Sequence, residues 1–196
     1  MTLALTLWLL QSQAVILENE FVRVTRNAAP CAQGVAPACG DRVIVALSDI
    51  ELKVASASRK LPRGGIAVFA AGEAHAVPTG GSYVEVAVKP DHPPVISLSE
   101  NIPPAKNAVL HDSPRLFIFE ERLAVGDTRA RHSHRQRVVI QLNRTRLQQW
   151  PEGQQEIVRE IVPDTAAFNA AVIHTVKNVG DLPLRGIVIE LKGKPH

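Results

Sequence analysis

The residues best suited to chemistry are three histidines in the last third of the chain. His132 and His134 are separated by one residue, in a segment that begins at Gly126, and His174 follows forty residues after His134. Side chains at positions i and i+2 of a β-strand point to the same face. Imidazole is a ligand for Zn, Cu, Fe and Ni. Three imidazoles on two strands therefore predict one transition-metal site with positions left open for water or a substrate.

The elements that must position these histidines are predicted to be short β-strands. In 196 residues the chain has 36 Val and Ile and 26 Gly and Pro, so stiff β-branched residues alternate with turn formers. Residues 154–162 fit a helix or a strand, and their β-branched residues favour the strand. We expect strands at 22–24, 42–47, 51–54, 66–69, 83–88, 116–119, 137–142, 144–147, 157–162, 171–176 and 185–191.

The sequence also contains an internal repeat. RVIVAL at 42–47 aligns with RVVIQL at 137–142 at an offset of 95 residues, and His75 aligns with His174 at an offset of 99. A proline-rich stretch at 90–107 reads as an extended connector between the two copies. We expect two tandem β units, 15–97 and 98–196, each closed into a barrel or a jelly roll to protect the sheet edges.

The histidine segment resembles the two motifs of the cupin superfamily. The first motif, a Gly followed after five residues by His-x-His, matches Gly126, His132 and His134. The second, a His followed after three residues by Asn, matches His174 and Asn178. The resemblance implies an all-β bicupin of two small jelly-roll barrels. It also implies that the second barrel holds a metal on the three histidines, that the chain binds a small molecule, and that it can form a homodimer.

The chain departs from the motif where the family has a glutamate after His-x-His. Gln136 shares the strand face of the two histidines and is the best substitute for a fourth ligand. Arginines alternate with these positions, and Arg131 and Arg137 are open to three interpretations. The first interpretation is a solvated outer face, the second is an anion-binding rim for a carboxylate substrate, and the third is a nucleic-acid contact. A net charge of +3 does not by itself argue for nucleic acid.

The first unit keeps less of the motif. His75, preceded by Gly72, is the one histidine that survives there. Either it has a structural role, or it joins Cys39 and Asp41 in a mixed metal site. One histidine cannot hold a metal tightly, and at least three protein ligands are usual, which favours the structural role. Cys31 and Cys39 lie in a Gly/Ala/Pro-rich segment and would form a local disulfide in an oxidising compartment. Such a disulfide would remove the thiolate from a metal site.

The N-terminus allows two interpretations. The apolar run at 2–10 is too short to span a bilayer. The small residues Ser12 and Ala14 stand at the −3 and −1 positions expected for signal-peptide cleavage after Ala14. No Lys or Arg precedes the run, which fits a plain strand or helix equally. Cleavage of residues 1–14 implies a periplasmic or secreted protein, and the alternative implies a cytoplasmic one.

Two classes of function follow from this sequence. The first is a metal-dependent small-molecule enzyme that uses Fe, Mn, Ni or Zn, with dioxygenase-like oxidation suggested by the cupin resemblance. The second is a non-catalytic cupin that binds a small ligand or carries a structural metal. Neither the metal nor the substrate is defined by the sequence.

Overall fold

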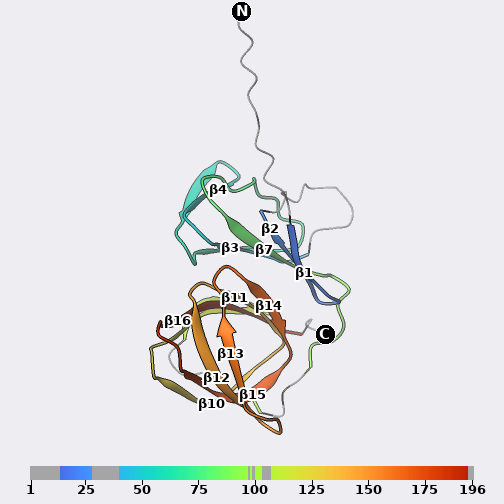
Figure 1. Ribbon diagram of the computed structural model, residues 1–196. Coiled ribbons are helices and arrows are strands. Elements are labelled where there is room, and N and C mark those ends of the chain that lie inside the picture. Colours follow the sequence, from blue (N-terminus) through green and yellow to red (C-terminus); the bar gives the residue numbers. More distant parts are fainter. Residues whose placement is uncertain (1–13, 28–39, 97, 99, 103–106, 194–196) are drawn as a thin grey trace, which may run out of the picture.

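A computed structural model describes residues 14–27, 40–96, 98, 100–102 and 107–193. Within these ranges the regular structure consists of sixteen strands, and the expected all-β fold is confirmed (Figure 1). In the part of the chain that the structure describes, no helix is long and apolar enough to cross a membrane.

The first half is built from seven strands. They are β1 (Ala14–Glu18), β2 (Val22–Arg26), β3 (Arg42–Ala46), β4 (Ile50–Val54), β5 (Ala57–Leu61), β6 (Ile66–Phe69) and β7 (Tyr83–Val88). Five of them form a sheet in the order β1-β2-β7-β3-β6, and β4 pairs with β5 in a separate hairpin. The hairpin packs over one face of the sheet, because the apolar residues of β4 join those of β3 and β6 in one cluster.

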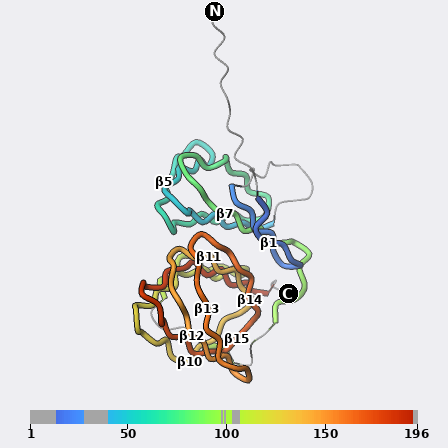
Figure 2. The backbone as a smooth tube through the Cα atoms, viewed as in Figure 1, coloured from blue at the N-terminus to red at the C-terminus, as the bar shows by residue number. Residues whose placement is uncertain are grey.

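The second half is built from nine strands in two sheets. They are β8 (Ala108–Asp112), β9 (Leu116–Leu123), β10 (Thr128–His134), β11 (Arg137–Gln141), β12 (Thr145–Pro151), β13 (Ile157–Ile161), β14 (Ala166–Asn169), β15 (Val172–Asn178) and β16 (Leu184–Leu191). One sheet has the order β14-β11-β16-β9-β8, and the other has the order β10-β15-β12-β13. In Figure 2 the chain of each half winds around its own interior.

The two halves repeat one topology. Read from the opposite edge, the sheet β8-β9-β16-β11-β14 has the same order as β1-β2-β7-β3-β6. The register repeats as well, since Ile44 pairs with Ala67 in the first half and Val139 pairs with Ala167 in the second. The repeat seen between 42–47 and 137–142 is thus a repeat of strand pairing.

The largest apolar core lies between the halves. It combines Val22, Val43 and Val86 of the first sheet with Ile118 and Ile187 of the second, all fully buried. Each five-stranded sheet therefore covers the other with one face and uses its opposite face to enclose its own interior. The halves are separate in topology, but they share their main source of hydrophobic stabilisation.

Polar contacts from the first half also hold a turn of the second. Arg26 donates from Nη2 to the main-chain oxygen of Asp164 at 2.6 Å. Arg63 donates from Nη2 to the Asp164 carboxylate, also at 2.6 Å, and to the main-chain oxygen of Leu142. This turn connects β13 to β14, and Thr165 next to it lines a cavity in the second half.

All eleven strands expected from the sequence are present, and the ambiguous segment 154–162 contains strand β13. The strands that the sequence did not predict include β5 and β8, whose residues are mostly exposed and carry no alternation of apolar and polar side chains. Hydrogen bonding to a neighbouring strand, and not an apolar face, forms these strands.

Two predictions concern parts of the chain outside the described residues. The predicted disulfide of Cys31 and Cys39 lies wholly outside them. So does the predicted signal segment, except for Ala14, which begins β1.

Candidate metal centre

The three histidines come together because β10 and β15 are neighbouring antiparallel strands. His132 and His174 are direct partners in the register of this pair. His134 follows two residues after His132, so its side chain emerges on the same face. The side chains are 1%, 2% and 5% exposed at positions 132, 134 and 174. The three residues that the sequence grouped lie together in the structure, since one ligand nitrogen from each lies within 4.8 Å of the others.

Two further motif residues fix the two strands relative to each other. Gly126 has φ +81°, a left-handed conformation that favours glycine, at the turn before β10. Its N–H donates to the Asn178 main-chain oxygen at 3.0 Å, and the Asn178 N–H donates to Asp127 at 3.0 Å. The Asn178 side chain is fully buried and bonds to Thr145, Gly180, Leu123 and Leu182. Asn178 thus holds the end of β15 in place and is not a ligand.

The tautomers of two histidines follow from their outer hydrogen bonds. His132 Nδ1 lies 2.8 Å from the main-chain oxygen of Ala130, and His134 Nδ1 lies 2.8 Å from Oε1 of Glu190. The main-chain oxygen of Ala130 can only accept, and the Glu190 carboxylate accepts when it is ionised. In that state each Nδ1 carries the hydrogen and each Nε2 of a neutral ring carries a lone pair. Partners of this kind orient metal-binding imidazoles in proteins.

The two lone pairs face each other. His132 Nε2 and His134 Nε2 are 3.0 Å apart, and with these tautomers neither can donate to the other. Two nitrogens that each lie about 2.1 Å from one ion, at right angles, are about 3 Å apart. The nearby Nε2 of His174 is buried and has no hydrogen-bond partner among the described residues. A shared cation would satisfy all three nitrogens, so the residues present fit a bound metal.

The electrostatics keep the three rings neutral. Burial lowers the pKa of His132 to about 4 and that of His174 to about 3, and it lowers the pKa of His134 well below its ordinary value. The cationic side chains of Arg129 and Arg137 act in the same direction. Neutral imidazole is the form that binds a metal, so the ligands need not lose protons at neutral pH.

Glu190 is the residue that sequence reasoning missed. It lies on β16, is 7% exposed, and accepts the hydrogen bond from His134. Burial raises its pKa to about 7. The sequence did carry a signal, because Glu190 is the one acid in the otherwise apolar segment 186–191. A carboxylate is therefore present at the site, bonded to a histidine and not in the position of the motif glutamate.

A cavity of about 280 Å³ adjoins the histidines. His134 and His174 lie in its wall together with Arg137 and Arg159, and Arg137 is buried deeply enough to lower its pKa to about 10. Arg159 has no ion-pair or hydrogen-bond partner among the described residues. The other polar side chains of the wall are Glu121, Gln141, Gln149, Glu160, Thr165 and Asn169.

An acid–base pair reaches the wall of this cavity through Glu121. The Glu121 carboxylate accepts from Arg129 Nη1 at 2.9 Å, and both side chains are largely buried. Burial raises the pKa of Glu121, although Arg129 and Arg137 act to lower it. Arg129 is thus paired with Glu121 and does not line the cavity, whereas Arg137 and Arg159 do.

Gln136 and Arg131, which the sequence offered as a fourth ligand and an anion contact, do not line the cavity. Gln136 Oε1 accepts from the Ile96 N–H at 2.8 Å, so this side chain fixes the connector and does not line the cavity. Arg131 is exposed and pairs with Glu100 at 2.9 Å and with Glu152. Arg131 directly precedes His132 on β10, and successive side chains of a strand point to opposite faces, so Arg131 points away from the histidine face. Of the two expected anion contacts, Arg137 alone lines the cavity.

The first half has no comparable cluster among its described residues. His75 is buried, with Nε2 3.0 Å from Glu85 and Nδ1 2.9 Å from the Ala76 main-chain oxygen. Asp41 is paired with Arg115. His75 and Asp41 thus have partners inside the protein, which matches the structural alternative for His75.

Comparison with known proteins supports the fold. No protein-family model and no curated protein matches the sequence. A cupin 2 conserved barrel domain protein from Leptotrichia buccalis matches with TM-score 0.53 and 15% identity, over 92% of this chain and 88% of that chain. AerE from Microcystis aeruginosa matches with TM-score 0.53 and 15% identity, over 91% of each. An oxalate decarboxylase matches with TM-score 0.54 and 10% identity, over 94% of this chain and 73% of that chain.

These similarities define the class of the protein. The chain has the cupin jelly-roll fold, and matches that span more than nine-tenths of it include both halves. The cupin resemblance of the segments around His132 and His174 is thus confirmed at the level of the fold. At these sequence identities the similarity carries no information on the reaction.

Proposed function

We propose that this protein is a metal-dependent enzyme that acts on a small molecule. His132, His134 and His174 would hold one divalent transition metal, Fe, Mn, Ni or Zn. The observation that carries the proposal is the 3.0 Å approach of two Nε2 atoms whose outer hydrogen bonds leave both with lone pairs. In a site without a cation this arrangement would be repulsive.

The surroundings of the histidines favour catalysis over a structural metal. Structural sites usually have four protein ligands, whereas three ligands and an adjoining cavity leave room for a substrate. When bound, the metal would act as a Lewis acid or, with a redox-active ion, support dioxygenase-like chemistry. Glu190 orients His134 by its hydrogen bond.

The cavity also suggests how a substrate is held. Arg137 and Arg159 bring two guanidinium groups to a space of about 280 Å³. A guanidinium binds a carboxylate through two parallel hydrogen bonds. A small carboxylate placed between the arginines and the metal is the substrate class that this wall fits. Arg159 takes the role that the sequence suggested for Arg131.

Metal analysis of tag-free protein, purified after growth with Fe, Mn, Ni and Zn supplied, tests the proposal. We expect close to one equivalent of a single transition metal per chain, and its loss in His132→Ala, because two remaining imidazoles bind a metal weakly. His75→Ala is the matched control and should retain the metal. Less than about a tenth of an equivalent in the unaltered protein would contradict the proposal.

The alternative is a cupin that binds a ligand or a metal without catalysis. It predicts a stoichiometric metal with no open coordination position. Electron paramagnetic resonance of the Mn or Co form with and without an added small carboxylate such as pyruvate separates the two. A change in the spectrum that Arg137→Gln abolishes contradicts a structural metal and supports an open site, and an unchanged spectrum supports the structural metal.

A further inference from the structure

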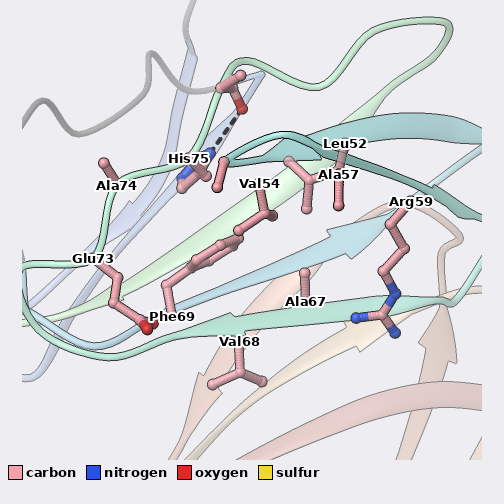
Figure 3. Close-up of a pocket in the computed structure, with 12 residues that line it drawn as sticks. Leu52, Val54, Ala57, Arg59, Ala67, Val68, Phe69, Glu73, Ala74 and His75 are labelled. Carbon is pink, nitrogen blue, oxygen red and sulfur yellow. Dashed lines mark hydrogen bonds between the residues drawn. The ribbon is translucent and has the colours of Figure 1, made fainter.

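A second and larger cavity lies in the first half. Its volume is about 730 Å³, within the range of small-molecule pockets. It opens between the β4–β5 hairpin and β6, and Figure 3 shows the side chains around it. Its polar residues are Arg59, His75 and Glu73, and the Glu73 carboxylate accepts from the Ala70 N–H at 2.6 Å. The other residues of the wall are apolar: Leu52, Val54, Ala55, Ala57, Ala67, Val68, Phe69, Ala74 and Ala76.

The wall of this cavity repeats the wall of the cavity in the second half. Leu52 pairs with Arg59 across the β4–β5 hairpin, as Leu147 pairs with Arg159 across β12 and β13. Both arginines line their cavities, and so do Ala67 and its counterpart Ala167. The internal repeat has therefore kept one arginine at the same place in both halves.

Arg59 lies on the inner face of its hairpin. Residues directly opposite in an antiparallel pair share a face, and its partner Leu52 is fully buried in the core of the first half. Among the described residues Arg59 has no carboxylate or carbonyl partner. Figure 3 shows its guanidinium beside Ala67 at the pocket. Arg59 is exposed to solvent at the edge of a largely apolar cavity, so its guanidinium is placed to bind an anionic group of a molecule that enters the cavity.

The rest of the wall differs from the second half in a consistent direction. Val54 stands where the second half has Gln149, and Phe69 stands where it has Asn169. Phe69 stacks on His75 with ring centroids 4.5 Å apart. Both ring nitrogens of His75 have partners within the protein and its side chain is fully buried, so His75 supports Phe69 from behind and offers no free ligand atom.

We propose that the first half is a metal-free binding site for a small carboxylic acid with an aromatic body. The carboxylate pairs with Arg59, and the ring lies against Phe69 and the apolar side chains around it. The site is a second ligand site of the molecule, separate from the histidine centre. It does not depend on the proposed enzyme, because none of its residues belongs to that centre.

Fluorine NMR titration of the full chain tests this site. The probe is 3-(4-fluorophenyl)propanoate, and 3-(4-fluorophenyl)propan-1-ol is its matched compound without a carboxylate. We expect the acid to bind about tenfold more tightly than the alcohol, because of the charged hydrogen bonds to Arg59. Arg59→Gln should weaken the acid by a similar factor, and Arg59→Lys should restore part of the binding.

Arg159→Gln is the matched control, since it removes the equivalent arginine from the other cavity. It should leave the affinity for the probe unchanged, as should His132→Ala. Arg59 is exposed, so its variants are expected to fold. The proposal is overturned if the acid does not bind, if Arg59→Gln leaves its affinity unchanged, or if Arg159→Gln weakens it as much as Arg59→Gln does.

Discussion

The chemistry of the second half depends on a few hydrogen bonds around the histidines. Three imidazoles could be placed together by chance, but their tautomers could not be set without Ala130 and Glu190. These two acceptors direct the lone pairs of His132 and His134 to one point. If the proposed metal binds here, a residue that does not touch it would therefore influence how tightly it binds.

Glu190→Gln tests this role. The amide can still accept from His134, but it removes the negative charge that makes the imidazole a better electron donor. We expect the metal affinity to fall by about 10- to 100-fold, measured by competition with a chromogenic chelator. Glu85→Gln is the matched control, because Glu85 contacts His75 in the same way in the other half. Equal affinities for the two variants would exclude the orienting role of Glu190.

At the scale of elements, the site requires that β10 and β15 stay in register. Asn178, at the end of β15, stabilises this register through hydrogen bonds of both its side-chain Oδ1 and its Nδ2. The motif spacing in the sequence therefore describes two different things. His174 is a ligand candidate, whereas the Asn four positions later is a structural lock that keeps His174 opposite His132.

Asn178→Ala should destabilise the protein by about 3 kcal/mol, because buried donors and acceptors lose their partners. Urea denaturation followed by tryptophan fluorescence measures the free energy of unfolding. Asn143→Ala is the control, since the Asn143 side chain makes one bond of 3.3 Å to Pro183 at the surface. A loss for Asn178→Ala no larger than that of the control would show that the lock is dispensable.

Strands whose apolar side chains recur at every position or every second position were predictable from the sequence. Strands β3 and β11 are buried along nearly their whole length, and both were found by their Val and Ile content. Strand β5 was not, because its sequence ASRKL has a single buried side chain.

The candidate site was predictable to a similar degree. Spacing along one strand was enough to group His132 with His134, and the motif brought in His174. Glu190, Arg159 and the inward position of Arg137 depend on which strands are neighbours and in what register. Gln136 was placed wrongly by face counting, because β10 ends at His134 and the chain bends before β11. For Arg131 the exposed position agrees with the solvated outer face that the sequence left open.

At the scale of the whole molecule, the buried histidines make the metal-free protein sensitive to acid. Each has a pKa near 6.5 when unfolded and a lower one when folded, so between pH 6.5 and about 4 the unfolded chain binds more protons. Stability from these groups is therefore lost as the pH falls through this window. Glu190, with its pKa raised to about 7, and Glu121, whose pKa is also raised by burial, oppose the trend, but they are two groups against three.

We expect the free energy of unfolding, measured by urea denaturation in the presence of EDTA, to be lower at pH 5 than at pH 7 by on the order of 3 kcal/mol. The variant His132→Gln should show a smaller difference, because one titrating group is gone. Equal stability at the two pH values would mean that the histidines are not buried in the neutral form.

The apolar core shared by the two halves keeps both cavities in one folded unit. Each five-stranded sheet would present a broad apolar face if its partner were removed, and the contacts from Arg26 and Arg63 to Asp164 would go with it. Because both faces belong to one polypeptide, the pairing needs no second molecule and does not weaken on dilution. Every chain therefore carries one histidine centre and one arginine pocket in a fixed one-to-one ratio, whatever its concentration.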